Sequence, residues 1–194
     1  MIEPFLSAIN WIDILVLGIL ARCIYAGGTY GFIVEFFKFL GMLMATFITL
    51  HYYTGFAAFL QGIMFISWEM PVVIAYGILW GGVVLIFKII RDGWLILFKT
   101  ETHPVLNKWG GAFLGGIRSI MVCGMMFLAF LLSEHPYLSR TAKASLSGFY
   151  LVDFSPSVYN FCYEKSVAKI FSTEKKNEAA FEIKDIGVKK NKKK

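Results

Sequence analysis

Five ionisable side chains lie inside apolar stretches of the sequence and are the first candidates for chemistry. They are Asp13, Arg22, Glu35, Lys38 and Arg118. A charge within a membrane-spanning helix is costly to insert, so such residues mark an ion path, a proton relay or a paired structural contact. Because Glu35 is the acidic residue well inside an apolar run, we favour a structural polar lock that fixes helix register. The residues of this candidate lock are Asp13, Arg22, Glu35 and Arg118, and an ion path through Glu35 and Arg22 is the alternative.

The sequence lacks the motifs that assemble a nucleophile, a general base or a phosphate cradle. GxSxG, HExxH, P-loop and dinucleotide fingerprints are all missing. The histidines and cysteines are widely separated, without the spacing of metal ligands: His51, His103, His135, Cys23, Cys123 and Cys162. We therefore expect no catalytic residue, no metal ion and no cofactor, and a protein that is not an enzyme.

The composition indicates the class of protein that must position these residues. Hydrophobic residues make up 57% of the chain and charged residues only 16%, whereas an ordinary globular chain is about 25% charged. Four apolar stretches approach the roughly 20 residues that a helix needs to cross a bilayer: 9–26, 32–53, 71–90 and 108–132. We expect an all-α integral membrane protein with these four helices in two antiparallel hairpins, within a domain of residues 1–135.

The remaining segments predict structure at the membrane surface. Residues 54–68 are apolar but too short to span, which favours an interfacial or re-entrant segment. Residues 88–99 place their charges on one face, as in an amphipathic helix lying along the membrane. Residues 136–172 mix aromatic, Ser and Lys residues and predict a third amphipathic segment. Residues 173–194 are rich in Lys and Glu, so we expect disorder there.

A glycine-rich corner, Gly27 to Gly31, separates the first two apolar runs. Glycine accepts the positive φ of a tight reversal, so the corner predicts the first hairpin. Arg22 lies six residues before its middle and Glu35 six residues after, which predicts that the two pair at similar depth. Asp13 has a second interpretation as a helix cap beside Asn10, at the membrane interface.

Small residues recur every fourth position in the last apolar run, at Gly111, Gly115, Ser119 and Cys123. Such a ridge lets helix backbones approach closely. We expect it to pack on the third helix at Gly77 and Gly81, or against the first hairpin, with self-association as an alternative.

Charge distribution bears on the signal sequence, the partners and the orientation. Met1 to Asn10 carries no basic residue, so we expect no cleavable signal peptide. The surplus of basic residues is concentrated in the lysine-rich tail. The sequence has no stripe of Arg residues with interleaved aromatic residues, so we do not expect nucleic acid as a partner. Basic residues near the corner and near 91–108 predict that this side is cytoplasmic. The lysine tail argues for the opposite orientation.

Three blocks of the sequence resemble the colicin V production protein (CvpA) family. They are NWID at 10–13, GFIVEFFKFLGMLMATFITLHYY at 31–53, and LNKWGGAFLGGIRSIMVCGMMFLAFLL at 106–132. Their order and spacing match over roughly residues 9–170. The positions that follow the family pattern are Trp11, Asp13, Gly31, Phe32, Glu35, Gly111, Gly115 and Arg118. The chain departs from it at Val34, where a basic residue is common, and at Asn107-Lys108, where Asp-Arg is common.

The resemblance implies a multi-pass protein of the bacterial inner membrane, linked to toxin production, secretion and homeostasis of the cell envelope. It implies no known reaction. We therefore expect a non-enzymatic accessory factor whose partners are membrane lipids and a second membrane protein or further copies of itself. The alternative is a small oligomeric transporter or channel subunit that uses Glu35 and Arg22.

Overall fold

A computed structural model describes residues 10–64, 69–97, 103–133, 136–167, 176–179 and 181. Its four long helices are α2 (Trp11–Tyr30), α3 (Phe32–Met64), α4 (Glu69–Leu97) and α5 (Pro104–Leu132). The short ones are α6 (Pro136–Ala144), α7 (Leu146–Leu151) and α8 (Phe154–Cys162), followed by a π-helical turn, Tyr163–Val167. All four long helices are long and apolar enough to cross a membrane. The all-helical class and the four candidate spans are thus confirmed for the described residues.

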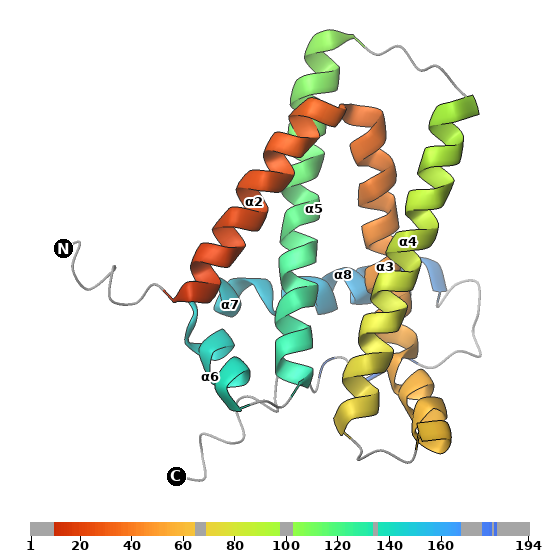
Figure 1. Ribbon diagram of the computed structural model, residues 1–194, viewed down its shortest axis with the longest axis vertical. Helices are drawn as coiled ribbons and strands as arrows, with labels where there is room; N and C mark the ends of the chain where they lie inside the picture. Colours follow the sequence, from red (N-terminus) through yellow and green to blue (C-terminus); the bar gives the residue numbers. More distant parts are fainter. Residues whose placement is uncertain are drawn as a thin grey trace, which may run out of the picture.

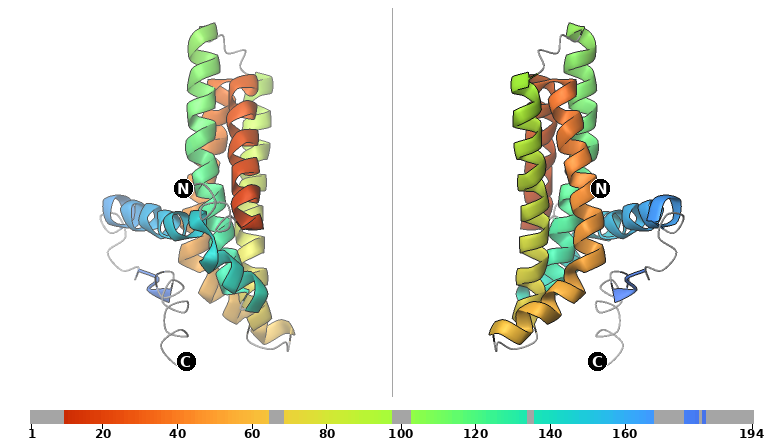
Figure 2. Two further views of the ribbon diagram at one scale, coloured as in Figure 1. Left: turned by 90° about the vertical axis from the view of Figure 1, so that its left-hand side faces the viewer. Right: turned by 90° about the vertical axis from the view of Figure 1, so that its right-hand side faces the viewer.

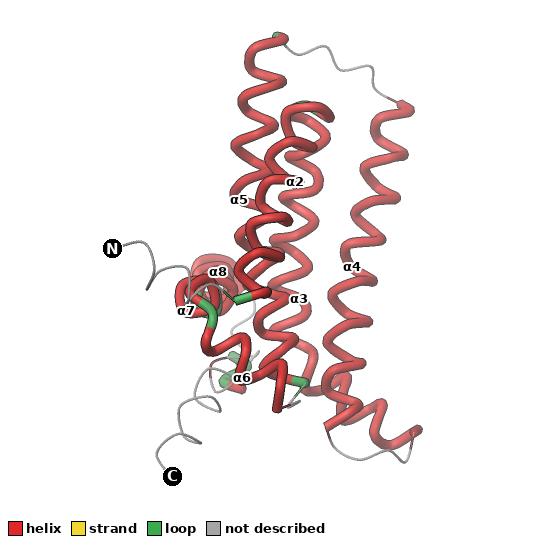
Figure 3. Tube along the Cα trace, turned by 60° about the vertical axis from the view of Figure 1, so that its left-hand side comes forward, coloured by secondary structure: helices red, strands yellow, loops and turns green. Residues whose placement is uncertain are grey.

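The long helices form an upright bundle, and the short helices cross its flank (Figures 1 and 2). Helix α5 packs on α2 and α3, and α4 lies at the edge of the bundle against α3 (Figure 3). Helices α7 and α8 run across the bundle near the N-terminal end of α2 (Figure 2). Four upright helices with crossing helices at one level fit a bilayer protein with a surface layer.

The predicted packing of consecutive helices into two hairpins, α2 with α3 and α4 with α5, is wrong for both pairs, since neither pair packs extensively. Helix α2 packs chiefly on α5, whereas α3 packs chiefly on α4 and then on α5. Helices α2 and α3 meet at the corner and diverge from it (Figure 1). A glycine corner determines that the chain reverses, but side-chain packing farther along determines which helix each arm contacts.

The corner itself has the backbone that the glycines predict. Gly31 adopts φ 89°, and its N–H donates to the Gly27 carbonyl at 3.1 Å. The Asn107 side chain then accepts the Phe32 N–H at 2.8 Å and so caps the start of α3 from another helix. The positive φ favours glycine here, and a Cβ on Gly31 would also displace the Asn107 amide that caps α3.

Two predicted surface segments are not separate elements, because they continue α3 and α4 without a break. Helix α3 runs unbroken through Thr54 to Met64, and its last part turns away from the bundle axis (Figure 2). Helix α4 likewise runs unbroken through Lys88 to Leu97. No proline interrupts either range, and an apolar length alone is not a helix stop signal. Residues 65–68 and 98–99 of those predicted segments lie outside the described part.

The start of the predicted disordered tail has a defined contact. Asn177 donates from its side chain to the Leu50 carbonyl at 2.8 Å and from its backbone to the Tyr159 hydroxyl at 3.1 Å. Tyr159 is fully buried, and its hydroxyl also lies 2.9 Å from His51 Nδ1. Residues 176–179 therefore dock on α3 and α8, while most of 173–194 lies outside the described residues.

Candidate functional site

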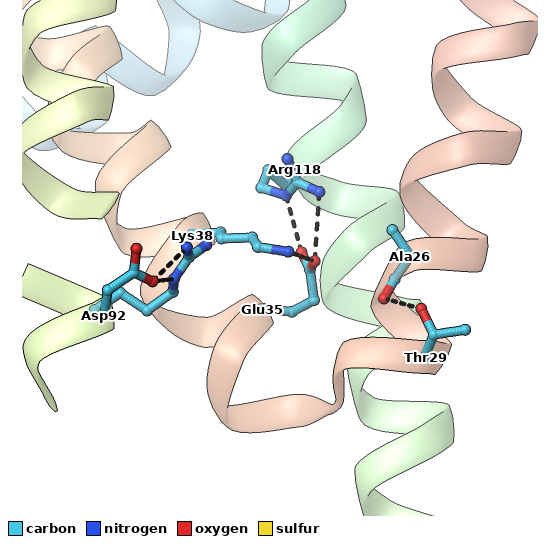
Figure 4. A network of polar contacts seen from close by, with 7 residues as sticks. Ala26, Thr29, Glu35, Lys38, Asp92 and Arg118 are labelled. Atoms are coloured by element: carbon cyan, nitrogen blue, oxygen red, sulfur yellow. Dashed lines mark hydrogen bonds and ion pairs between the residues drawn. The ribbon is translucent and has the colours of Figure 1, made fainter. Parts of the chain in front are cut away.

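Glu35 is the centre of the charged site. It lies in the first turn of α3, just after the corner, and its side chain is fully buried. Arg118 of α5 donates from Nε to Oε2 at 2.9 Å and from Nη2 to Oε1 at 3.5 Å. Lys38 donates to Oε1 at 2.7 Å (Figure 4). Two cations from two helices thus neutralise one buried carboxylate, which is the arrangement that makes a buried charge tolerable.

The predicted pairing of Glu35 with Arg22 is wrong. Among the described residues Glu35 pairs with Lys38 and Arg118, whereas Arg22 is exposed on α2. Counting residues from the corner gave the height of Arg22 along its helix but not the direction of its side chain. Because α2 leans on α5, the helix that faces Glu35 is α5, and Arg118 takes the place expected for Arg22.

Lys38 is held from two sides. Its ammonium group binds Glu35 one helical turn before it, and it lies 4.3 Å from the centre of the Tyr30 ring. A cation over an aromatic face is attracted by the negative ring surface. The contact connects the end of α2 to α3 on the corner side of the ion pair.

Asp13 belongs to a separate polar cluster at the other end of α2. It accepts the Asn10 N–H at 3.0 Å and the Ser147 N–H at 2.9 Å, and the Ser147 hydroxyl donates to the same oxygen as the Ser147 N–H. Asn10 donates to the Thr141 carbonyl at 3.0 Å. The capping interpretation of Asp13 is therefore confirmed by the capping box, and its placement with Glu35 in one lock is wrong. Asp13 ties α2 to α7, and Asn10 ties the start of α2 to α6.

Replacing Asp13 with Ala should destabilise the protein by about 1–2 kcal/mol. The change removes the Asp13 half of the capping box, which accepts the Asn10 N–H, and leaves the Ser147 N–H without its acceptor. Ser147→Ala removes only the hydroxyl bond and should cost less. The stability of both variants is measured by thermal unfolding in mild detergent, monitored by tryptophan fluorescence. Equal losses of stability in the two variants would contradict the conclusion that Asp13 binds both Asn10 and Ser147.

The glycines of α5 allow α2 to approach closely. A Cβ on Gly111 would overlap the Gly27 carbonyl, and a Cβ on Gly115 would overlap the Cys23 carbonyl. The small-residue ridge thus packs on the first apolar helix, one of the two arrangements that its spacing allowed. Gly77 and Gly81 have open space where a Cβ would lie, so they do not form the predicted contact with the ridge.

A cavity of about 340 Å³ opens beside the ion pair, between α3, α4 and α5. Its walls are Lys38, Gly41, Met42, Trp80, Val84, Phe87, Lys88, Arg91, Arg118 and Val122. Gly41 lets α4 approach, because a Cβ there would lie 2.7 Å from the Phe87 Cβ. The sequence placed Lys88 and Arg91 on a surface segment, so their position beside Arg118 was missed. Their spacing of three residues was the available signal, since it puts both on one helix face.

Other candidates for chemistry have structural partners. His51 lies with Nδ1 2.9 Å from the Tyr159 hydroxyl, and its ring stacks on the Phe47 ring with the centroids 5.5 Å apart. Burial raises the pKa of the Cys162 thiol in α8, so that cysteine is a poor nucleophile. Within the described ranges, no three residues of the His, Cys, Asp and Glu types group as metal ligands.

The fold and the charged site define a polytopic helical membrane protein held by an intramembrane ion pair. The sequence profile of the colicin V production protein family matches residues 12–156. The chain therefore belongs to that family, as its resemblance predicted. Searches among curated proteins and among solved structures gave no match.

Five positions that follow the family pattern make structural contacts in this chain. Asp13 caps α2 and binds Ser147, and Gly31 forms the corner. Glu35 and Arg118 form the ion pair, while Gly111 carries the closest approach of α2 to α5. At one departure from the pattern, Asn107 still caps α3 through a neutral amide oxygen.

Proposed function

We propose that this protein is a non-enzymatic accessory factor of the bacterial inner membrane, acting in the production or export of a colicin V-like toxin and in envelope homeostasis. The observation that carries the proposal is the bonding of Glu35. Its carboxylate is fully buried and bound by Arg118 and Lys38, so it is committed to holding helices together. A group in that state supports a scaffold role more than proton transfer.

The outward surface of α4 supports a role through partners. Its exposed residues include Gly77, Ile78, Gly81, Leu85 and Ile89. In a bilayer such a face contacts either lipid tails or another membrane helix. Small residues on the face favour contact with another helix, because they let the two backbones approach closely. We propose a membrane-protein partner or a second copy of this chain as its occupant.

Complementation of toxin export tests this function. A colicin V-producing strain that lacks its own family member should regain extracellular toxin when it expresses the wild-type chain. Gly81→Leu, which fills an open position on α4 without disturbing the bundle, should keep normal protein levels but reduce extracellular toxin severalfold. Lys108→Gln, an exposed change outside α4, is the matched control. Failure of the wild-type chain to restore toxin would overturn the proposal.

A transporter or channel subunit is the second candidate, and the cavity beside Glu35 is the observation that favours it. In the structure the ion path would involve Glu35 and Arg118 instead of Glu35 and Arg22. Reconstituted vesicles should then show proton or ion flux that Glu35→Gln abolishes while the protein remains monodisperse. Flux equal to that of empty vesicles would exclude this candidate.

A further inference from the structure

The cavity between α3, α4 and α5 contains more positive than negative charge. Four basic side chains line it: Lys38, Lys88, Arg91 and Arg118. Two carboxylates bind these cations. Glu35 binds Lys38 and Arg118, and the Asp92 carboxylate lies 2.6 Å from the Arg91 guanidinium. The described residues therefore leave a surplus of two positive charges at this site. A partly dehydrated surplus of this kind is stabilised by a bound anion.

Donor groups in the cavity remain available for such an anion. Lys88 is exposed and makes no ion pair or hydrogen bond with the described residues. Arg118 uses two of its nitrogens on Glu35, and a guanidinium has five N–H donors. The indole nitrogen of Trp80 is buried without a hydrogen-bond partner. Three kinds of donor thus converge from α4 and α5 on one space.

The rest of the cavity wall is apolar. It is formed by Met42, Val84, Phe87 and Val122, of which Val84 is 42% exposed. From Pro71 to Lys88 the helix rises roughly 26 Å at 1.5 Å per residue. With Pro71 placed at one edge of a hydrocarbon core about 30 Å thick, Lys88 and Arg91 come to the opposite headgroup level and Val84 lies beside the acyl chains. A soluble anion could bind the basic side chains of the cavity, but it has no apolar part to contact the apolar wall.

We propose that this cavity is a binding site for an anionic phospholipid. Its phosphate lies among Lys88, Arg91 and Arg118, and one acyl chain follows Val84 and Phe87 down α4. Basic pockets between membrane helices are a recurring way to hold acidic headgroups. The bound lipid would cover the gap between α4 and α5, which contact each other far less than α4 contacts α3. This proposal rests on the cavity alone and not on the function proposed above.

Calorimetric titration of the detergent-purified protein tests the site. Short-chain phosphatidylglycerol should bind with 1:1 stoichiometry, and Lys88→Gln should weaken binding about tenfold, a typical effect of losing a charge-assisted contact. Lys88→Arg should retain binding. Lys108→Gln removes an exposed cation outside the cavity and should leave the affinity unchanged. Trp80→Phe keeps the ring but not the N–H and should weaken binding a fewfold.

Three results would overturn the proposal. Equal binding of phosphatidylcholine would show that only apolar contact matters. Equal binding of inorganic phosphate would show a site for a free anion instead of a lipid. An equal loss in Lys88→Gln and Lys108→Gln would show diffuse surface charge and no defined site. Melting curves of each variant without lipid distinguish loss of binding from loss of fold.

Discussion

Arg118→Gln should destabilise the bundle by about 3–5 kcal/mol, because it removes the cation through which a fully buried carboxylate of α3 is bound to α5. Lys38 would remain on Glu35, but it comes from the same helix and cannot tie α3 to α5. For a chain of this size such a loss lowers the melting temperature by roughly 10 °C. Tryptophan fluorescence during heating in mild detergent measures the change. The membrane-inserted yield should fall in parallel.

Two further variants make this prediction specific. Arg22→Gln removes the exposed arginine of α2 and should change stability by no more than about 0.5 kcal/mol. The double variant Glu35→Gln with Arg118→Gln should cost less than the sum of its two single changes, since either single change already breaks the contact between the two residues. The conclusion that the Glu35–Arg118 ion pair connects α3 to α5 would be contradicted by either of two results. One is a large loss of stability in Arg22→Gln, and the other is a double variant whose loss equals the sum of the two single losses.

Gly111→Ala should cost about 3 kcal/mol, although it adds a single methyl group. A Cβ at this position overlaps the Gly27 carbonyl, and backbone cannot give way as a flexible side chain can. We expect α2 to separate from α5, which exposes the apolar surface between them and causes aggregation. The monodisperse fraction on size-exclusion chromatography, together with the melting temperature, measures the effect. Gly27→Ala should behave alike, because its Cβ would overlap the Gly111 carbonyl.

Gly81→Ala is the matched control, since a Cβ there has open space around it. Alanine is also the better helix former by about 1 kcal/mol, so this variant should be as stable as the wild type or slightly more stable. Gly77→Ala should give the same result for the same reason. If all four glycine variants lost stability equally, glycine flexibility and not close helix approach would be the cause.

The residues of the ion pair were recognisable from the sequence, but their pairing was not. Glu35 and Arg118 each interrupt an apolar run, and a charge in such a run requires a partner. Spacing along the chain fixes the height of a residue on its helix. It does not fix which neighbouring helix faces that residue, and here α2 turns Arg22 outward while α5 brings in Arg118.

The sequence by itself determined the class of protein, the corner at Gly27 to Gly31 and the cap at Asn10, because apolar length, glycine and capping side chains act within a few residues. Only the tertiary structure decided that α2 packs on α5, that Lys88 and Arg91 face Arg118, and that Asp13 binds Ser147. Those contacts join segments far apart in the chain. Their geometry depends on how helix surfaces fit together, and a linear pattern does not encode that fit residue by residue.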